Sequence, residues 1–300
     1  MSRLELLRGD LPPAGHPVIL RAGGDLPRFP GYRPLWLNSG TAALALAMLL
    51  ARRRRPELAR PEAVLPAYGC PDLVAAAVHA GVTPVLADIQ AEDPGYCLDS
   101  LEAVIGPNTV AVVAVNFLGI ADRLEALQAL LRRRADALLI EDNAQWFPEA
   151  EPGVRLRGDM VCLSFGRGKP VSLLGGGALL VAEHLCEPLG VGAIPLAPAR
   201  NGSLLEVEVA TRLYNLLLQP RLYWLMNRNP VLRLGRTVYR ELQAIEACPL
   251  HRLKRLPANV AAHIARPRHT ERLLHTMVAS LENVSSLPAR VGRRAGRLLR

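Results

Sequence analysis

Short apolar runs that alternate with helical stretches constrain the fold of this chain more than any other feature. Between the runs lie helical stretches at residues 73–80 and 123–131. The apolar runs are residues 64–65, 82–87, 110–115, 137–140 and 161–165. Strands that alternate with helices in this way form a parallel sheet covered by helices. We therefore expect an α/β fold with a mostly parallel sheet flanked by helices, followed by a helical C-terminal part with helices at 204–218 and 231–245.

Lys169 stands out because the chain carries nearly all of its positive charge on arginine. Lys169 and Lys254 are the two lysines among 36 basic residues. An amine that loses its proton can form a Schiff base with an aldehyde, whereas a guanidinium cannot. A solvated or phosphate-contacting lysine is the alternative for such a glycine-rich loop. A nucleotide-hydrolysing phosphate loop is excluded, because Leu163 and Pro170 stand where its first glycine and its hydroxyl residue are required.

Asp142 comes directly after an apolar run and is expected at the C-terminal end of a buried strand. In open α/β sheets, ligands bind at that edge. A lysine that forms an imine and a carboxylate that keeps a pyridine nitrogen protonated are two of the protein groups that pyridoxal 5'-phosphate requires. Lys169 and Asp142 together therefore indicate this cofactor.

Residues 38–42 (Asn-Ser-Gly-Thr-Ala) form a polar glycine turn that leads directly into the apolar helical stretch 43–50. The free N–H groups and the positive end of a helix favour a bound anion there. An ordinary Ser or Thr cap in front of a core helix is the alternative interpretation. Residues 175–177 (Gly-Gly-Gly) indicate backbone crowding before a strand at 178–181.

Four separated blocks carry a family resemblance. They are residues 38–43 (NSGTAA), 64–68 with 80–88 (VLPAY and AGVTPVLAD), 140–145 (IEDNAQ), and 158–169 followed by 175–181. In this order they resemble the DegT/StrS-type sugar aminotransferases, which are fold-type-I pyridoxal phosphate enzymes. The resemblance extends over roughly residues 33–185.

The resemblance implies roles for individual residues. Lys169 would bind the cofactor covalently as the catalytic lysine, Asp142 would pair with the pyridine nitrogen, and Gln145 would lie beside the ring. The phosphate would be bound by Gly40, Thr41, Ala42 and Ser164.

Several positions depart from the family pattern. An aromatic or histidine ring usually stacks on the cofactor near position 70, where this chain has Cys70, with Tyr68 two residues earlier. We include both Tyr68 and Cys70 among the cofactor-binding candidates. Asn116 stands where a histidine is common, and Asn201 and Asn215 are candidates for an asparagine that the partner subunit lends to the phosphate.

The resemblance also implies an activity and a domain organisation. We expect a cytoplasmic homodimer that transfers an amino group from a glutamate-like amino acid to a nucleotide-linked keto-sugar, in polysaccharide or secondary-metabolite biosynthesis. The expected parts are an N-terminal segment at 1–32, a cofactor-binding domain at 33–198, a helical region at 199–265, and the start of an incomplete small domain at 266–300. The alternatives are a truncated, non-catalytic remnant that binds cofactor or dimerises, and a different pyridoxal reaction on the same fold.

Charge, hydropathy and cysteine content argue against other functions. The net charge of +9 comes from scattered arginines and short runs at 52–55 and 132–134, with few aromatics, so we expect no nucleic-acid partner. The apolar stretch 216–226 is too short to span a bilayer. Five dispersed cysteines without paired metal spacing and without a secretory signal predict free thiols and no metal site.

Overall fold

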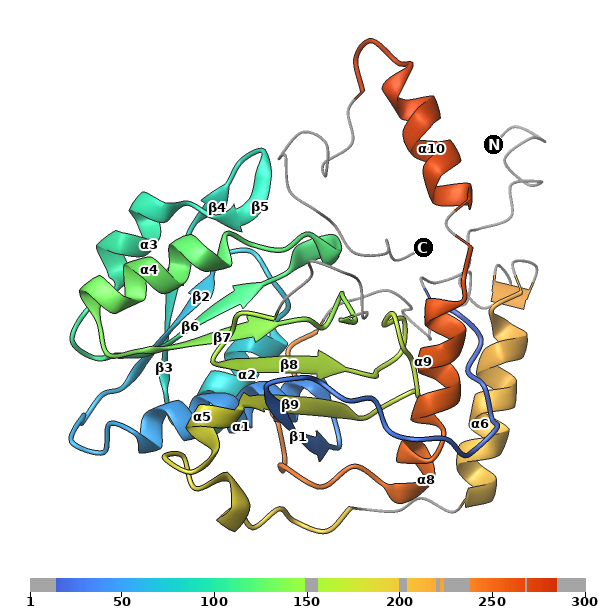
Figure 1. The fold of residues 1–300 in the computed structure, drawn as a ribbon, viewed down its shortest axis with the longest axis horizontal. Coiled ribbons are helices and arrows are strands. Elements are labelled where there is room, and N and C mark those ends of the chain that lie inside the picture. Colours follow the sequence, from blue (N-terminus) through green and yellow to red (C-terminus); the bar gives the residue numbers. More distant parts are fainter. Residues whose placement is uncertain are drawn as a thin grey trace.

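A mixed seven-stranded sheet forms the centre of the protein (Figure 1). The computed structural model describes residues 15–148, 156–199, 204–219, 222–223, 238–267 and 269–284. The strand order is β1-β9-β8-β7-β6-β2-β3, in which β3, β2, β6, β7 and β8 are parallel and β9 is antiparallel to both of its neighbours. The strands are β1 (Tyr32–Leu37), β2 (Glu62–Pro66), β3 (Thr83–Ala87), β6 (Thr109–Val115), β7 (Leu138–Asp142), β8 (Met160–Ser164) and β9 (Gly177–Ala182), and β4 (Ile89–Gln90) and β5 (Asp93–Tyr96) form a separate hairpin.

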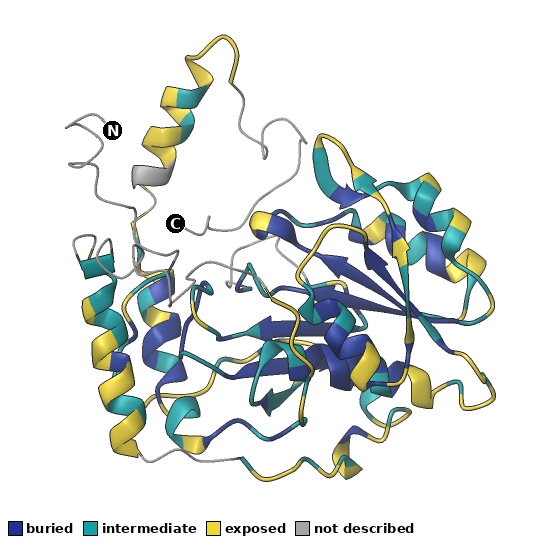
Figure 2. Cartoon of the chain, turned by 180° about the vertical axis from the view of Figure 1, so that it is seen from behind, coloured by how far each residue is buried: buried dark blue, intermediate teal, exposed yellow. Residues whose placement is uncertain are grey.

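Helices cover both faces of the sheet. One face packs against α1 (Gly40–Arg53) and α2 (Asp72–His79), and the other against α3 (Leu98–Val104), α4 (Leu124–Arg134) and α9 (Leu256–Ile264). The remaining helices are α5 (Glu183–Cys186), α6 (Leu204–Leu217), α8 (Leu250–Leu253) and α10 (His269–Ala279). Figure 2 shows the buried sheet between these layers, whereas α10 extends away from the body and is largely exposed. The expected α/β fold with a mostly parallel sheet is therefore confirmed.

The alternation of side chains along buried strands decides which face each residue occupies. Leu138 and Ile140 of β7 pack on the α1 face, while Leu139 packs on the α4 face. With this period of two, Asp142 lies on the α1 face and Glu141 on the α4 face. Two adjacent carboxylates thus point into different environments.

The sequence predicted most of the central strands and the helices that cover them, with ends that differ by no more than three residues. β1 was not predicted; it contains Pro34, and proline removes a ladder hydrogen bond and is disfavoured in central strands. β1 lies at the edge of the sheet, where a proline is tolerated.

The predicted helix at 231–245 is wrong over residues 238–245, which contain no helix, and residues 231–237 lie outside the described ranges. The chain here leads to residues that pair with the end of β1. Asn38 N donates to Glu246 O at 2.9 Å, and Cys248 N donates to Trp36 O at 3.0 Å. Over residues 238–245, the helical pattern before these paired residues does not form a helix, which shows that a local propensity is a weak guide in this segment.

In the segment 266–300, which was expected to start a small domain, α10 begins at His269, after Pro267. The boundaries of the four predicted parts of the chain stay a prediction. In the described ranges, no helix has both the length and the apolar character needed to cross a membrane. Residues 220–221 and 224–226 of the apolar stretch lie outside those ranges.

Candidate functional site

The predicted site residues lie at one edge of the sheet because several chain segments end or begin there. The parallel strands β7 and β8 end at Asp142 and Ser164. The antiparallel strand β9 begins at Gly177, which is paired with both Ser164 and Leu37, so β1 also ends at this edge and leads into α1. The strand ends thus bring the first turn of α1 next to Ser164.

A cavity of about 60 Å³ lies at this edge, and we call it the Lys169 cavity. Its lining residues are Gly40, Thr41, Leu44, Cys70, Asp72, Leu73, Asp142, Ala144, Cys162, Leu163, Ser164 and Lys169. Six of the nine candidate site residues are therefore brought together. Sites for drug-sized ligands usually measure ~300–1,000 Å³, so the described residues enclose only part of a cofactor-sized site.

Asp142 is held at the cavity by a single local contact. Its side chain is 6% exposed, and its Oδ1 accepts a hydrogen bond from Ala144 N at 2.9 Å. Burial raises the pKa of Asp142 above its ordinary value, while the Ala144 amide and the charge of Lys169 act in the opposite direction. Among the described residues no donor reaches Oδ2, so this carboxylate suits a ligand that brings an N–H or a positive charge.

Lys169 is presented to the same cavity by a tight loop after β8. Gly168 has φ = +74°, a conformation that favours glycine, and Lys169 N donates to Gly166 O at 3.3 Å. Arg266 Nη1 donates to Pro170 O at 3.5 Å and so connects the loop to the residues after α9. Lys169 lines the cavity together with Asp142 and Cys70, and its charge acts to lower the pKa of both groups.

The first turn of α1 offers donors for an anion. Ser39 Oγ accepts from Ala42 N at 3.0 Å, so the ordinary helix cap is present and the Ala42 amide is already bound. Helix geometry leaves the amides of Gly40 and Thr41 without an acceptor inside α1. A Cβ atom on Gly40 would lie 2.6 Å from Ser164 Cβ, so only glycine fits against that side chain. The cradle consists of the Gly40 and Thr41 amides and the Ser164 hydroxyl.

This set of groups fits pyridoxal phosphate. Lys169 supplies an amine, Asp142 has an unoccupied acceptor oxygen, and the α1 cradle supplies donors for a phosphate. Residues 175–177 confirm the expected crowding, since a Cβ atom on Gly177 would lie 2.5 Å from Ser39 C. The close approach of β9 to the start of α1 holds the cradle in place.

Three predicted cofactor residues do not line the Lys169 cavity. Ala42 is buried in the core. Tyr68 is 71% exposed, its ring centroid lies 6.0 Å from that of Phe117, and it lines a separate cavity of about 590 Å³. Gln145 Oε1 instead accepts from Leu118 N at 2.6 Å. The cofactor contacts of these residues stay predictions.

The asparagine candidates have other partners. Asn116 is fully buried and donates through Nδ2 to Glu141 Oε1 at 3.1 Å. Asn215 holds the N-terminal segment of its own chain, because its Oδ1 accepts from Val18 N at 2.8 Å and its Nδ2 donates to Val18 O at 2.9 Å. Asn201 lies outside the described residues.

Of the six cavity residues that were not predicted from the sequence, Cys162 and Asp72 carry titratable side chains. Cys162 pairs with Asp142 across β7 and β8 and lies on the same face two residues before Ser164, so the period of two could have identified it. Asp72 begins α2, and its Oδ2 accepts a hydrogen bond from Thr41 Oγ1 at 3.1 Å. Its contact with Thr41 joins two helices and has no local sequence signal.

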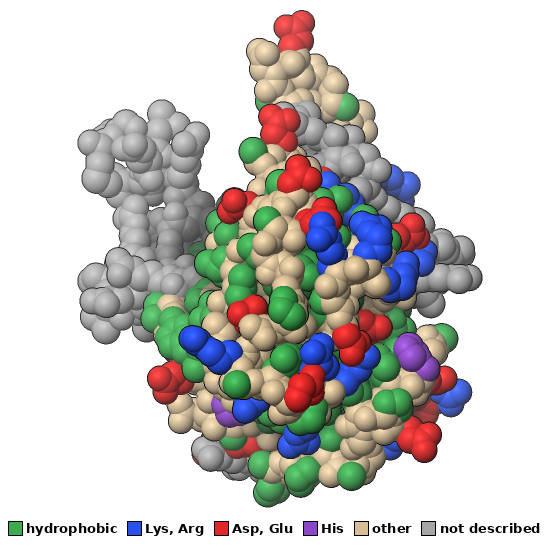
Figure 3. Space-filling view, turned by 90° about the vertical axis from the view of Figure 1, so that its left-hand side faces the viewer, with side chains coloured by type: hydrophobic (Ala, Val, Ile, Leu, Met, Phe, Trp, Pro, Cys, Tyr) green, Lys and Arg blue, Asp and Glu red, His purple; other side chains and the backbone are tan. Residues whose placement is uncertain are grey.

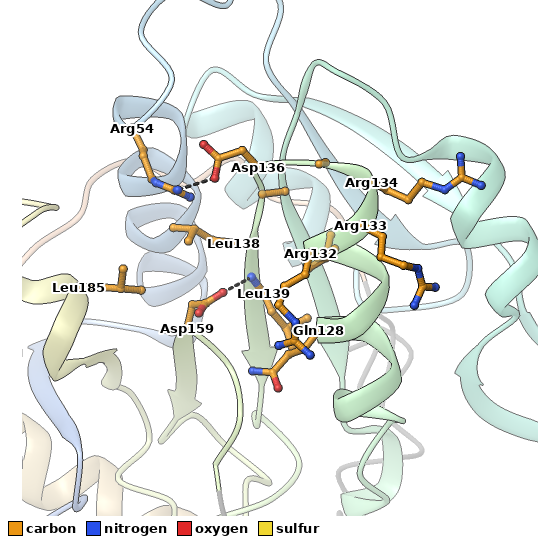
Figure 4. Close-up of a pocket in the computed structure, with 13 residues that line it drawn as sticks. Arg54, Gln128, Arg132, Arg133, Arg134, Asp136, Leu138, Leu139, Asp159 and Leu185 are labelled. Atoms are coloured by element: carbon orange, nitrogen blue, oxygen red, sulfur yellow. Dashed lines mark hydrogen bonds and ion pairs between the residues drawn. The ribbon is translucent and has the colours of Figure 1, made fainter.

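A larger pocket, of about 670 Å³, lies at the opposite edge of the sheet (Figure 4). Its arginines do not converge on one point, since Arg54 pairs with Asp136 while Arg133 and Arg134 extend away from that pair. Positive and negative side chains are also interspersed on the face shown in Figure 3. This pocket, although larger than the Lys169 cavity, therefore does not indicate a reactive site.

The cysteines and acidic residues of the described ranges form neither a disulfide nor a metal site. All five cysteines are free thiols. No group of three or more His, Cys, Asp or Glu residues within the described ranges is arranged to hold a metal ion.

Comparison with known proteins gives matches in sequence and in fold. A curated relative from Acidithiobacillus ferrooxidans, a UDP-N-acetyl-3-dehydro-α-D-glucosamine 3-aminotransferase, is 30% identical over 146 residues, which are 48% of this chain and 38% of the relative. A putative L-glutamine:3-amino-2,3-dideoxy-scyllo-inosose aminotransferase from Streptomyces kanamyceticus is 32% identical over 157 residues, 50% of this chain and 35% of the relative. The matched part thus spans less than half the length of either relative.

A solved putative sugar aminotransferase from Streptococcus pneumoniae, in its apo form, shares the fold with a TM-score of 0.55 at 17% identity, over 84% of this chain and 60% of that one. The family model described as the DegT/DnrJ/EryC1/StrS aminotransferase family matches residues 34–187, just over half of the 300 residues, and includes the sheet edge with Asp142, Ser164 and Lys169. The chain belongs to the DegT/DnrJ/EryC1/StrS aminotransferase family.

Proposed function

We propose that this chain is the cofactor-binding part of a pyridoxal phosphate-dependent aminotransferase. The observation that carries the proposal is the convergence of Lys169, Asp142 and Ser164 with the first turn of α1 on one cavity. These groups come from separate elements of the chain. Membership of an aminotransferase family gives independent support.

Each residue has a distinct part in this function. Bound pyridoxal phosphate supplies an electron sink for the carbanion that forms when an amino acid loses its α-proton. Asp142 holds a proton on the ring nitrogen and thereby strengthens that sink. Ser164 and the α1 cradle bind the phosphate and fix the position of the ring. Lys169 attaches the cofactor through its amine and, once free, moves the α-proton, a type of transfer worth ~10²–10⁴-fold in rate.

The proposed substrates are a glutamate-like amino donor and a nucleotide-linked keto-sugar acceptor in polysaccharide or secondary-metabolite biosynthesis. A UDP-linked amino-sugar enzyme and a scyllo-inosose enzyme among the relatives support this class of acceptor.

The proposed assembly is a homodimer, and exposed apolar side chains near the sheet edge, Tyr68 and Leu118, favour a partner surface there. The proposed location is the cytoplasm, where unpaired cysteines such as the five in this chain stay reduced.

The test is the attachment of pyridoxal phosphate to one named lysine. Wild-type protein should develop the visible absorbance band of a lysine-bound cofactor, and borohydride should fix the cofactor onto Lys169, as peptide mapping would show. Lys169→Ala should lose the band and the adduct. Lys254→Ala is the matched control, because Lys254 is the only other lysine and should be replaceable.

The addition of glutamate tests the transfer itself, because an amino donor should remove the band of the lysine-bound cofactor. A folded wild-type protein that shows no band would contradict the proposed enzyme. An adduct on Lys254 instead of Lys169 would contradict the assignment of the catalytic lysine.

A further inference from the structure

Asp72 lines the Lys169 cavity, although none of the sequence blocks that carry the family resemblance includes it. It is the first residue of α2 and lines the cavity together with Gly40, Thr41 and Ser164. The Thr41 hydroxyl donates to Asp72 Oδ2 at 3.1 Å. A carboxylate therefore stands beside the donors that would bind a phosphate.

This contact weakens the cradle in two ways. A hydroxyl has one hydrogen to donate, so Thr41 cannot donate to a phosphate oxygen while it is bound to Asp72. An ionised carboxylate at this position also repels a phosphate, because like charges in a partly buried site are poorly screened. The charge of Asp72 already acts across the cavity, where it contributes to the raised pKa of Asp142 and of the Cys70 thiol.

A simpler role for Asp72 is the stabilisation of α2. An acidic residue in the first turn interacts favourably with the positive end of the helix. That role predicts an effect on stability and none on the choice of ligand. The hydrogen bond to Thr41 across two helices is not needed for it.

We propose that Asp72 is a specificity-determining residue that lowers the affinity of the site for the phosphate group of its cofactor. The inference rests on the proposed function and deepens it. Asp72 sets how tightly a phosphate-bearing ligand is held, while the ring and the aldehyde are left to Asp142 and Lys169. Replacement by asparagine removes the charge and keeps an oxygen that can accept from Thr41.

The experiment compares wild type and Asp72→Asn in the full chain. Dissociation constants for pyridoxal phosphate and for pyridoxal, which lacks the phosphate, are measured by fluorescence titration. Binding of inorganic phosphate is measured from the concentration dependence of the melting temperature. Asp99→Asn is the matched control, because Asp99 is an exposed acidic residue in the first turn of α3 and does not line the cavity.

Asp72→Asn should bind pyridoxal phosphate and inorganic phosphate at least ~10-fold more tightly, as expected for the loss of one nearby like charge. Its affinity for pyridoxal should stay within about twofold of wild type. Asp99→Asn should change none of the three affinities. Unchanged or weaker phosphate binding in folded Asp72→Asn would overturn the inference, and so would an equal gain for pyridoxal.

Thr41→Val gives a second test that does not depend on the folding of the first variant. Because the Thr41 hydroxyl already donates to Asp72, loss of this hydroxyl should change phosphate affinity by no more than about threefold. A loss of ~10-fold or more in phosphate affinity would show that the Thr41 hydroxyl donates to the phosphate. It would contradict the proposal that Asp72 keeps this hydroxyl from the phosphate.

Failure of the proposed function would look different. If wild type forms no Lys169 adduct while Asp72→Asn still binds phosphate more tightly, the proposed enzyme function is contradicted and the role of Asp72 is supported.

Discussion

Glu141 and Asp142 are adjacent in the chain, and both are buried, yet they lie in two regions of opposite character. Glu141 accepts four hydrogen bonds on the α4 face of the sheet, each of 3.0 or 3.1 Å. Asp142 on the α1 face accepts one, from Ala144 N, and lines the Lys169 cavity. One carboxylate is fully satisfied by its own chain, and the other is not.

This difference identifies Glu141 as a structural carboxylate and Asp142 as a carboxylate that can bind a ligand. The donors to Glu141 come from Asn116, Asn143, Arg157 and Gly158, so it joins the ends of β6 and β7 to the loop before β8. A buried charge is tolerated when its hydrogen bonds are complete. Within the described ranges Asp142 has no such set of donors, and desolvation raises its pKa. It suits a site whose function requires an open acceptor.

The largest effect should come from Asp142→Asn, which tests whether the open carboxylate is the functional one. If Asp142 keeps the ring nitrogen protonated, its loss should lower kcat by ~10²–10³-fold, the usual cost of one electrostatic partner in an active site. Steady-state kinetics with glutamate would measure it. Wild-type kcat in this variant would contradict the role of Asp142.

The same variant predicts a pH-dependent gain in stability without cofactor. Because burial raises the folded-state pKa of Asp142, folding takes up protons, and the stability of wild type falls as pH rises above the unfolded value of ~4. Asp142→Asn lacks this penalty. It should melt at a higher temperature than wild type at pH 7, and the gain should vanish below about pH 4.

Glu141→Gln should have the second largest effect, this time on stability. The new amide group would face N–H donors, and each buried donor left unpaired costs ~1–3 kcal/mol. We expect the free energy of unfolding to fall by at least ~2 kcal/mol, as measured by urea denaturation. Asp142→Asn is its matched control. Equal losses in the free energy of unfolding in both variants would contradict the distinction between the two carboxylates.

Ser39→Ala should have the smallest effect and sharpens the comparison at the sheet edge. It removes the cap of α1 without a change of charge and should cost ~1 kcal/mol of stability. Ser39→Asn should restore most of it, because asparagine caps helices as well as serine does. A loss as large as that of Glu141→Gln would mean that the cradle of the Lys169 cavity is itself a main stabilising element.

The sequence predicted the parts of the site that follow from strand ends and local motifs. Asp142 ends a buried strand, and the apolar run before it located that end. Ser164, within the run 161–165, was assigned from the family resemblance, and it proved to be the last residue of β8. The glycine turn before α1 and the loop with Lys169 were identified from short motifs and from the family resemblance. In contrast, the segment 238–245 was misassigned as a helix. It leads to residues 246–248, whose partner, the end of β1, lies about 200 positions away in the chain.

By itself, the sequence determined the parallel sheet, the order of its strands along the chain, and a lysine, a carboxylate and a glycine turn that would meet at one edge. Periodicity and residue chemistry are local properties, so they can be read from neighbouring positions. Only the tertiary structure decided that Glu141 is enclosed by donors while Asp142 is left open. It also placed Asp72 against Thr41 from a separate helix. Such contacts depend on the packing of elements distant in sequence, which no local pattern specifies.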